Sequence, residues 1–66
     1  MIYHDKASAY TALAVRVIPL AKTVDDLNVW WRGEAERREI FGIGKDSPEW
    51  QTLVKACADR KAAINA

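Results

Sequence analysis

The chain has 66 residues, of which ten are basic and nine are acidic, and its formal net charge is +1 at pH 7. Because charges of both signs are mixed along the chain, the composition argues against a strongly basic nucleic-acid-binding protein and against an acidic mimic of DNA. The single cysteine excludes an internal disulfide and a multi-cysteine metal site, and the longest uncharged stretch, residues 7–15, is too short to span a bilayer.

These limits predict one small cytoplasmic domain over residues 1–66, without a signal peptide, a cofactor or a bound metal. A chain of this length lies near the lower limit for independent folding, and eleven of its apolar residues are alanines, which bury little area. We therefore expect self-association or a partner to contribute to stability. The three tryptophans, two tyrosines and one phenylalanine argue against a disordered chain.

Heptad spacing in the first third of the chain predicts a helix over about residues 5–18, with His4 or Asp5 as its N-cap. Pro19 has no amide donor and clashes with the preceding turn, so we expect this helix to kink or end near Ile18. The β-branched stretch Ala14–Ile18 offers an alternative strand, which would have no second strand to pair with. The residues with heptad spacing, which we call the seam, are Tyr3, Ala7, Tyr10, Ala14, Val17, Ala21 and Val24.

The segment Thr23–Phe41 predicts the central element, an amphipathic helix over residues 24–41. Thr23 is suited to be its N-cap, and Gly42 is suited to end it because glycine readily adopts the left-handed conformation. Glu34 and Arg38 lie four residues apart near the middle of the apolar side, so we expect them to pair. That apolar side is formed by Val24, Leu27, Trp30, Trp31, Ala35 and Phe41.

A third helix is predicted over residues 48–64, because Ser47 can cap it and Pro48 suits its first position. Its apolar side consists of Trp50, Leu53, Val54, Cys57, Ala58 and Ile64. Lys55, Asp59 and Arg60 are expected to face water. Lys61 lies within the apolar side and would extend its ammonium group outward.

The predicted fold is therefore an all-α, three-helix domain in which the second and third helices form an antiparallel hairpin across residues 42–46. The second and third helices also match each other at an offset of 23 residues, for example Trp30 with Leu53 and Phe41 with Ile64. This match indicates either an internal repeat or two amphipathic helices with similar apolar stripes.

The sequence offers no catalytic arrangement, so we expect a non-enzymatic protein. His4 has no positioned nucleophile near it in the sequence, and Cys57 is expected to be a buried, inert thiol, with Lys61 as the only local cation that would activate it. The carboxylates have the spacing of helix caps and solvated faces rather than of metal ligands.

The aromatic and arginine residues of the second helix predict a protein-binding surface. Successive helical residues diverge by about 100°, so we expect Trp31 to turn inward and Trp30 to reach a seam or an interface. We expect this surface to bind another protein or a second copy of the chain in a homodimer. The candidate partner-binding residues are Trp30, Trp31, Arg37, Arg38, Tyr10 and Phe41.

An alternative is contact with single-stranded nucleic acid through cations that include Arg32, Lys55, Arg60 and Lys61. Glutamates at positions 34, 36 and 39 alternate with the arginines of the second helix and cancel most of their field, which favours salt bridging or protein binding.

The segments DLNVWWRGEAERREI and SPEWQTLVKACADRKAAI resemble helical hairpins near the C-termini of phage single-strand annealing proteins of the essential-recombination-function type. The resemblance covers residues 23–64 and is carried mainly by Leu27, Trp30, Trp31, Arg60 and Lys61. The annealing domain proper is absent, so the resemblance does not imply annealing activity. It implies a phage or mobile-element accessory protein that binds a host or recombination component. Together with the protein-binding surface, this leads us to expect an inhibitor or adaptor. The sequence is equally compatible with a whole protein and with a fragment of a longer one.

Overall fold

The computed structural model describes residues 6–66, and the residues proposed for the first N-cap and the start of the seam, Tyr3, His4 and Asp5, lie outside this range. Throughout the described residues the regular structure is helical, as predicted. The elements are α1 (Lys6–Val17), the 3₁₀ turn η1 (Ile18–Leu20), α2 (Val24–Gly33), α3 (Ala35–Ile40) and α4 (Pro48–Asn65). The alternative strand over Ala14–Ile18 is wrong, because these residues belong to α1 and η1.

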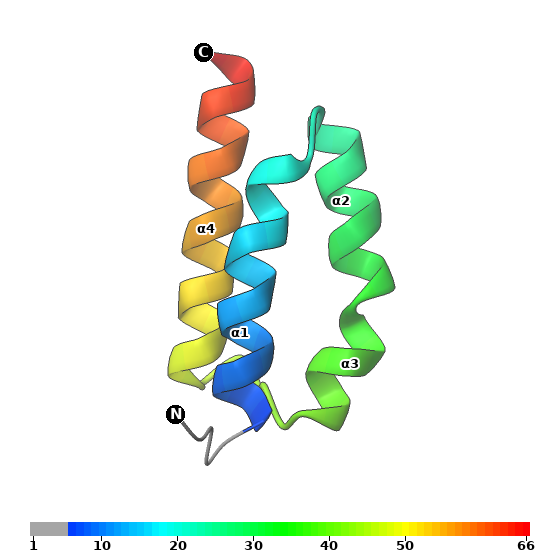
Figure 1. Cartoon of the computed structure of the whole chain (residues 1–66), viewed down its shortest axis with the longest axis vertical. Helices are drawn as coiled ribbons and strands as arrows, with labels where there is room; N and C mark the ends of the chain where they lie inside the picture. The colour runs from blue at the N-terminus through cyan, green and yellow to red at the C-terminus, as the bar shows by residue number, and fades with distance from the viewer. Residues whose placement is uncertain (1–5) are drawn as a thin grey trace.

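The helices form a bundle with three legs. As Figure 1 shows, α1 and α4 lie side by side and run in the same direction, and α2 followed by α3 runs in the opposite direction at the right of the view. The bundle measures 37 × 24 × 18 Å. Helix α4 makes its most extensive contact with α1 and a smaller one with α2, so the predicted hairpin of the second and third helices is not confirmed as the main packing unit.

The predicted local signals at the helix ends are confirmed. Helix α1 ends at Val17, and Pro19 lies in the η1 turn, which is closed by the Ala21 amide donating to the Ile18 carbonyl at 3.2 Å. The Thr23 hydroxyl accepts from the Asp26 amide at 3.0 Å at the start of α2. The Ser47 hydroxyl accepts from the Trp50 amide at 3.2 Å at the start of α4.

The turn after α3 is a Schellman motif centred on Gly42, which has φ +74°. The Gly42 amide donates to the Glu39 carbonyl at 3.0 Å, and the Ile43 amide donates to the Arg38 carbonyl at 2.8 Å. This turn places Ile43 in the core, where it is 4% exposed. The sequence pattern predicted a turn at this position but did not predict that Ile43 would be buried.

The prediction of one continuous helix over residues 24–41 is wrong, because the helix is interrupted at Glu34. The Glu34 amide is shared between the carbonyls of Trp30 (3.0 Å) and Trp31 (3.3 Å). The Arg38 guanidinium, through Nη1, also donates to the Trp31 carbonyl at 2.7 Å. In an uninterrupted helix that carbonyl would accept from the amide of Ala35. At the point where the helix is broken, the Arg38 side chain therefore donates to the carbonyl that the helical backbone would otherwise use.

The core is built around Ile18, Leu27 and Leu53, one from each leg of the bundle, and all three are fully buried. On α1 the buried stripe differs from the predicted seam: Ile18 is 1% exposed, whereas Val17 is 42% exposed. Thr11 is also buried, and its hydroxyl donates to the Ala7 carbonyl at 2.8 Å, so its polar group is satisfied.

Two further expectations for the third helix need correction. Arg60 does not simply face water, because its Nε donates to the Ala21 carbonyl at 2.8 Å and ties α4 to the chain that follows η1. Val54 and Ala58, assigned to the apolar side, are exposed. Among the helices of residues 6–66, none has the length and hydropathy that crossing a membrane requires.

The central role of Leu53 gives a direct test of the packing. We expect Leu53→Ala to lower the free energy of unfolding by about 2–5 kcal/mol, because the residue is fully buried and its truncation leaves a cavity. Its neighbour Val54 is 41% exposed, so Val54→Ala should cost less than about 1 kcal/mol. Urea unfolding followed by circular dichroism measures both values, and equal losses in the two variants would contradict this assignment of the core.

Candidate protein-interaction site

Arg38 is the buried charged side chain of the described structure, at 6% exposure. Its guanidinium carbon lies 3.9 Å from the centroid of the Trp31 ring and 5.5 Å from that of Trp50. The two indoles meet edge to face, with centroids 5.4 Å apart. Because a guanidinium is attracted to aromatic faces and also donates to the Trp31 carbonyl, this arrangement compensates the charge and joins α3 to α2 and α4.

The predicted pair between Glu34 and Arg38 is wrong. At the helix break, Glu34 instead accepts from two other residues. Arg37 Nη1 lies 3.2 Å from Glu34 Oε2, and the Tyr10 hydroxyl donates to Glu34 Oε1 at 2.9 Å. The first contact is local, whereas the second connects α1 to the junction of α2 and α3. Glu34 therefore positions the Tyr10 ring across the bundle.

Tyr10 is held by packing as well as by this hydrogen bond. Its ring lies 5.3 Å from that of Phe41, with an interplanar angle of 40°. Burial and, next, the hydrogen bond to the Glu34 carboxylate raise the pKa of Tyr10 to about 12. The phenol therefore stays protonated and continues to donate throughout the neutral range.

A groove of about 390 Å³ lies between α1 on one side and α2 and α3 on the other; we call it the interaction groove. Its apolar wall on α1 is open to solvent, because Leu13 is 65% exposed and Val17 is 42% exposed. Trp30 and Phe41 line the opposite wall. The complete lining is Tyr10, Leu13, Ala14, Val17, Trp30, Glu34, Arg37 and Phe41.

Of the six residues predicted to bind a partner, the structure brings four into this groove. Trp31 and Arg38 instead pack with Trp50 on another side of α2. Leu13 was not among the predicted partner-binding residues, and Val17 was assigned to the heptad seam. The spacing of Leu13, Val17 and Leu20 at i, i+4 and i+7 was the available signal, since it marks a second apolar stripe beside the buried one.

A second groove, of about 330 Å³, lies between α2 and α4, and we call it the indole groove. It is lined by Leu27, Asn28, Trp31, Trp50, Val54, Cys57, Ala58 and Lys61. Burial raises the pKa of the Cys57 thiol, and the charges of Lys61 and Arg38 oppose this rise. The thiol is 9% exposed, so the arrangement favours a protonated and inert side chain.

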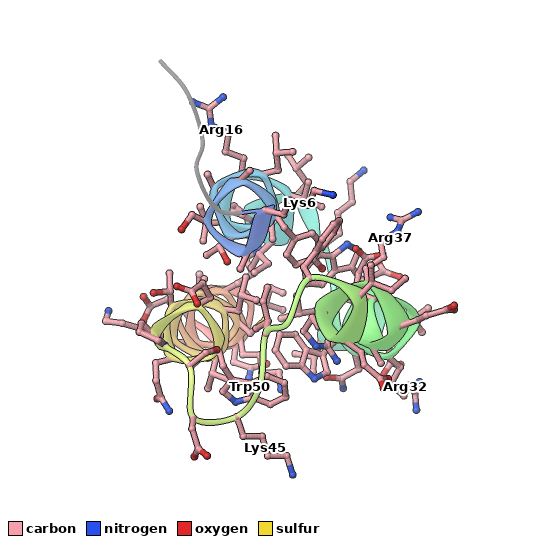
Figure 2. The ribbon with its side chains drawn as sticks, turned by 90° about the horizontal axis from the view of Figure 1, so that it is seen from below. Lys6, Arg16, Arg32, Arg37, Lys45 and Trp50 are labelled. Carbon is pink, nitrogen blue, oxygen red and sulfur yellow. The ribbon has the colours of Figure 1, made fainter. Side chains whose placement is uncertain are left out.

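The cations considered for nucleic-acid contact are distributed over different parts of the bundle. Lys55 pairs with Asp59 at 3.3 Å, Arg60 donates to a backbone carbonyl, and Lys61 lines the indole groove. Figure 2 shows Arg32 pointing away from the bundle on the side of α2 and α3. Within residues 6–66, no three His, Cys, Asp or Glu side chains are grouped as a metal site requires.

No family model, curated protein or solved structure matches the chain. The resemblance to segments of phage annealing proteins therefore depends on the sequence pattern alone.

The two neighbouring arginines allow a matched test of the guanidinium stack. We expect Arg38→Lys to lower the free energy of unfolding by about 1–3 kcal/mol, because a lysine ammonium is a compact point charge that does not reproduce both the contact with the indoles and the hydrogen bond to the Trp31 carbonyl. Arg37→Lys should change the free energy of unfolding by less than about 0.5 kcal/mol, since the Arg37 side chain is 67% exposed. Chemical unfolding measures both, and an equally mild effect at position 38 would refute the structural role of the stack.

The raised pKa of Tyr10 predicts a specific loss of stability at alkaline pH. The folded state favours the neutral phenol, so its contribution is complete below the ordinary phenol pKa of 10.0 and is lost as the pH rises through about 12. A Tyr3→Phe background leaves Tyr10 as the only tyrosine, and its tyrosinate absorbance should rise with a midpoint near pH 12. The additional Tyr10→Phe change should weaken the alkaline dependence of unfolding; an unchanged dependence would count against the Glu34 contact.

Proposed function

We propose that the chain is a non-enzymatic helical module that binds an α-helical segment of another protein in the interaction groove. The observation that carries this proposal is the exposure of Leu13 (65%) and Val17 (42%) on one wall, opposite the rings of Trp30 and Phe41. Apolar patches of this kind commonly mark interaction sites, and an amphipathic helix is a recurrent occupant of a groove between two helices.

Two of the aromatic side chains that line the groove, Tyr10 and Phe41, are held in place before any partner arrives. The Tyr10 hydroxyl is bound to Glu34, and the Tyr10 ring lies against Phe41. Side chains that are already ordered lose little conformational entropy on binding, so more of the contact energy is retained as affinity. Leu13 and Val17 then supply the apolar surface that the partner covers.

The charges around α1 favour an acidic partner. From residue 6 to residue 24 the chain carries Lys6, Arg16 and Lys22 and no acidic residue. A helix with glutamates or aspartates beside its apolar stripe would complement these cations. A symmetric dimer built on the same face of α1 would bring like charges together, which disfavours a second copy as the occupant.

In the phage or mobile-element setting that the sequence resemblance implies, such a module would act as an inhibitor or adaptor of a host or phage protein. A non-enzymatic domain can inhibit a target protein by binding a helix that the target uses for another interaction. The same binding would satisfy the expectation that a partner adds to the stability of so small a domain.

A displayed library of helical peptides tests the proposal without requiring the natural partner. Selection against the protein should enrich peptides with apolar residues at i, i+4 and i+7 and with acidic flanks. For an enriched peptide, Trp30→Ala and Leu13→Ala should each weaken binding by more than about 1 kcal/mol in calorimetry. Val29→Ala is the matched control, because Val29 is 61% exposed on α2 but does not line the groove.

Three results would contradict the proposal. They are the absence of any selected helical peptide, enrichment of basic rather than acidic flanks, and equal affinity of the Trp30→Ala variant and the unaltered protein. A sedimentation measurement on the protein alone adds an independent check, since a stable dimer that buries Trp30 would identify a second copy as the occupant.

A further inference from the structure

The indole groove is separate from the interaction groove and lies on the α4 side of α2. Its volume of about 330 Å³ falls at the lower end of the range of roughly 300–1,000 Å³ that is typical of small-molecule sites. Its residues come from two helices that run in opposite directions, as Figure 1 shows. The groove therefore has two distinct ends, which are set by different side chains.

One end of the groove is aromatic and the other is cationic. On α4, residues Trp50, Val54, Cys57 and Lys61 recur at i, i+4, i+7 and i+11, so they follow one face of the helix from the groove's aromatic end to its cationic end. Trp31 of α2 meets Trp50 at 5.4 Å. Because α2 is antiparallel to α4, its earlier residues lie toward the Lys61 end.

The charge of the groove has a single sign. Lys61 is the only charged residue among the eight that line it, and it takes part in neither of the ion pairs of residues 6–66, Glu34–Arg37 and Lys55–Asp59. Arg38 adds a second positive charge behind the two indoles. The adjoining hollow on α2 is lined by one residue of each charge, Asp25 and Arg32.

We propose that the indole groove binds a small aromatic monocarboxylate. The flat apolar body lies against Trp31 and Trp50, and the carboxylate reaches the Lys61 ammonium, with the Asn28 amide as a second donor. A cationic ligand of the same shape is disfavoured, because Lys61 and Arg38 would repel it. The inference does not depend on the proposed protein-binding function, since the two sites share no lining residue.

The test uses naphthaleneacetate as the probe and naphthaleneethanol as its neutral counterpart. In two-dimensional NMR, naphthaleneacetate should shift the indole N–H signals of Trp31 and Trp50, while that of Trp30 shifts little because Trp30 does not line this groove. Binding of the carboxylate should be about fivefold tighter than that of the alcohol, the upper value for one solvent-accessible ion pair. Lys61→Gln should abolish this preference and leave binding of the alcohol unchanged.

Lys55→Gln is the matched control, because Lys55 lies on the same helix, is paired with Asp59 and does not line the groove. Asn28→Asp is a second variant that keeps Lys61, and it should weaken binding of the carboxylate by placing a like charge beside it. The proposal is overturned if the probe shifts no indole signal, if Trp30 responds as strongly as Trp31 and Trp50, or if the preference for the carboxylate survives in Lys61→Gln.

Discussion

The stack of Arg38 on two indoles is the interaction on which the rest of the structure depends. A buried guanidinium without a carboxylate would normally be costly, because its hydration is lost. Here the faces of Trp31 and Trp50 and the Trp31 carbonyl replace water around it. The same carbonyl is the acceptor that a continuous helix would use, so the contact stabilises the break between α2 and α3 together with the packing of α4.

The break has consequences on the opposite side of the helix. With Arg38 directed to the indoles, Glu34 accepts instead from Arg37 and from Tyr10 of α1. The hydrogen bond from Tyr10 to Glu34 fixes one of the aromatic side chains that line the interaction groove. Arg38 thus contacts residues of the indole groove, whereas Glu34 contacts residues of the interaction groove.

The sequence allowed the helix ends to be predicted, since these depend on local rules. Thr23 and Ser47 cap helices through their own hydroxyls, Pro19 stops α1, and Gly42 adopts positive φ. The break at Glu34 directly follows Gly33, which weakens a helix interior, but this local signal did not by itself predict the interruption, because Arg38, four residues later, also occupies the Trp31 carbonyl. Arg60 was misplaced for the same reason, as its acceptor lies 39 residues away at Ala21.

The apolar residues of α1 show how far heptad periodicity can predict which side chains are buried. A seven-residue repeat drifts against the 3.6-residue turn, so a heptad seam extended over several turns selects Val17 where the bundle buries Ile18. A second apolar stripe, formed by Leu13, Val17 and Leu20, lies beside the buried one, and the heptad pattern alone does not decide which of the two stripes is covered. Four of the six predicted partner-binding residues line the interaction groove, and the three aromatic ones among them, Tyr10, Trp30 and Phe41, are only partly buried.

The tandem tryptophans separate the two grooves. Their ring centroids lie 6.4 Å apart, yet Trp30 lines the interaction groove and Trp31 lines the indole groove. Adjacent residues on a helix diverge by about 100°, so one bundle of three legs cannot cover both rings completely, and both are only partly buried. Glu34 contacts Tyr10 and Arg37, which line the interaction groove, and Arg38 contacts Trp31 and Trp50, which line the indole groove. Because no ion pair within residues 6–66 joins these two side chains, each wall keeps its own set of contacts once the helix break has formed.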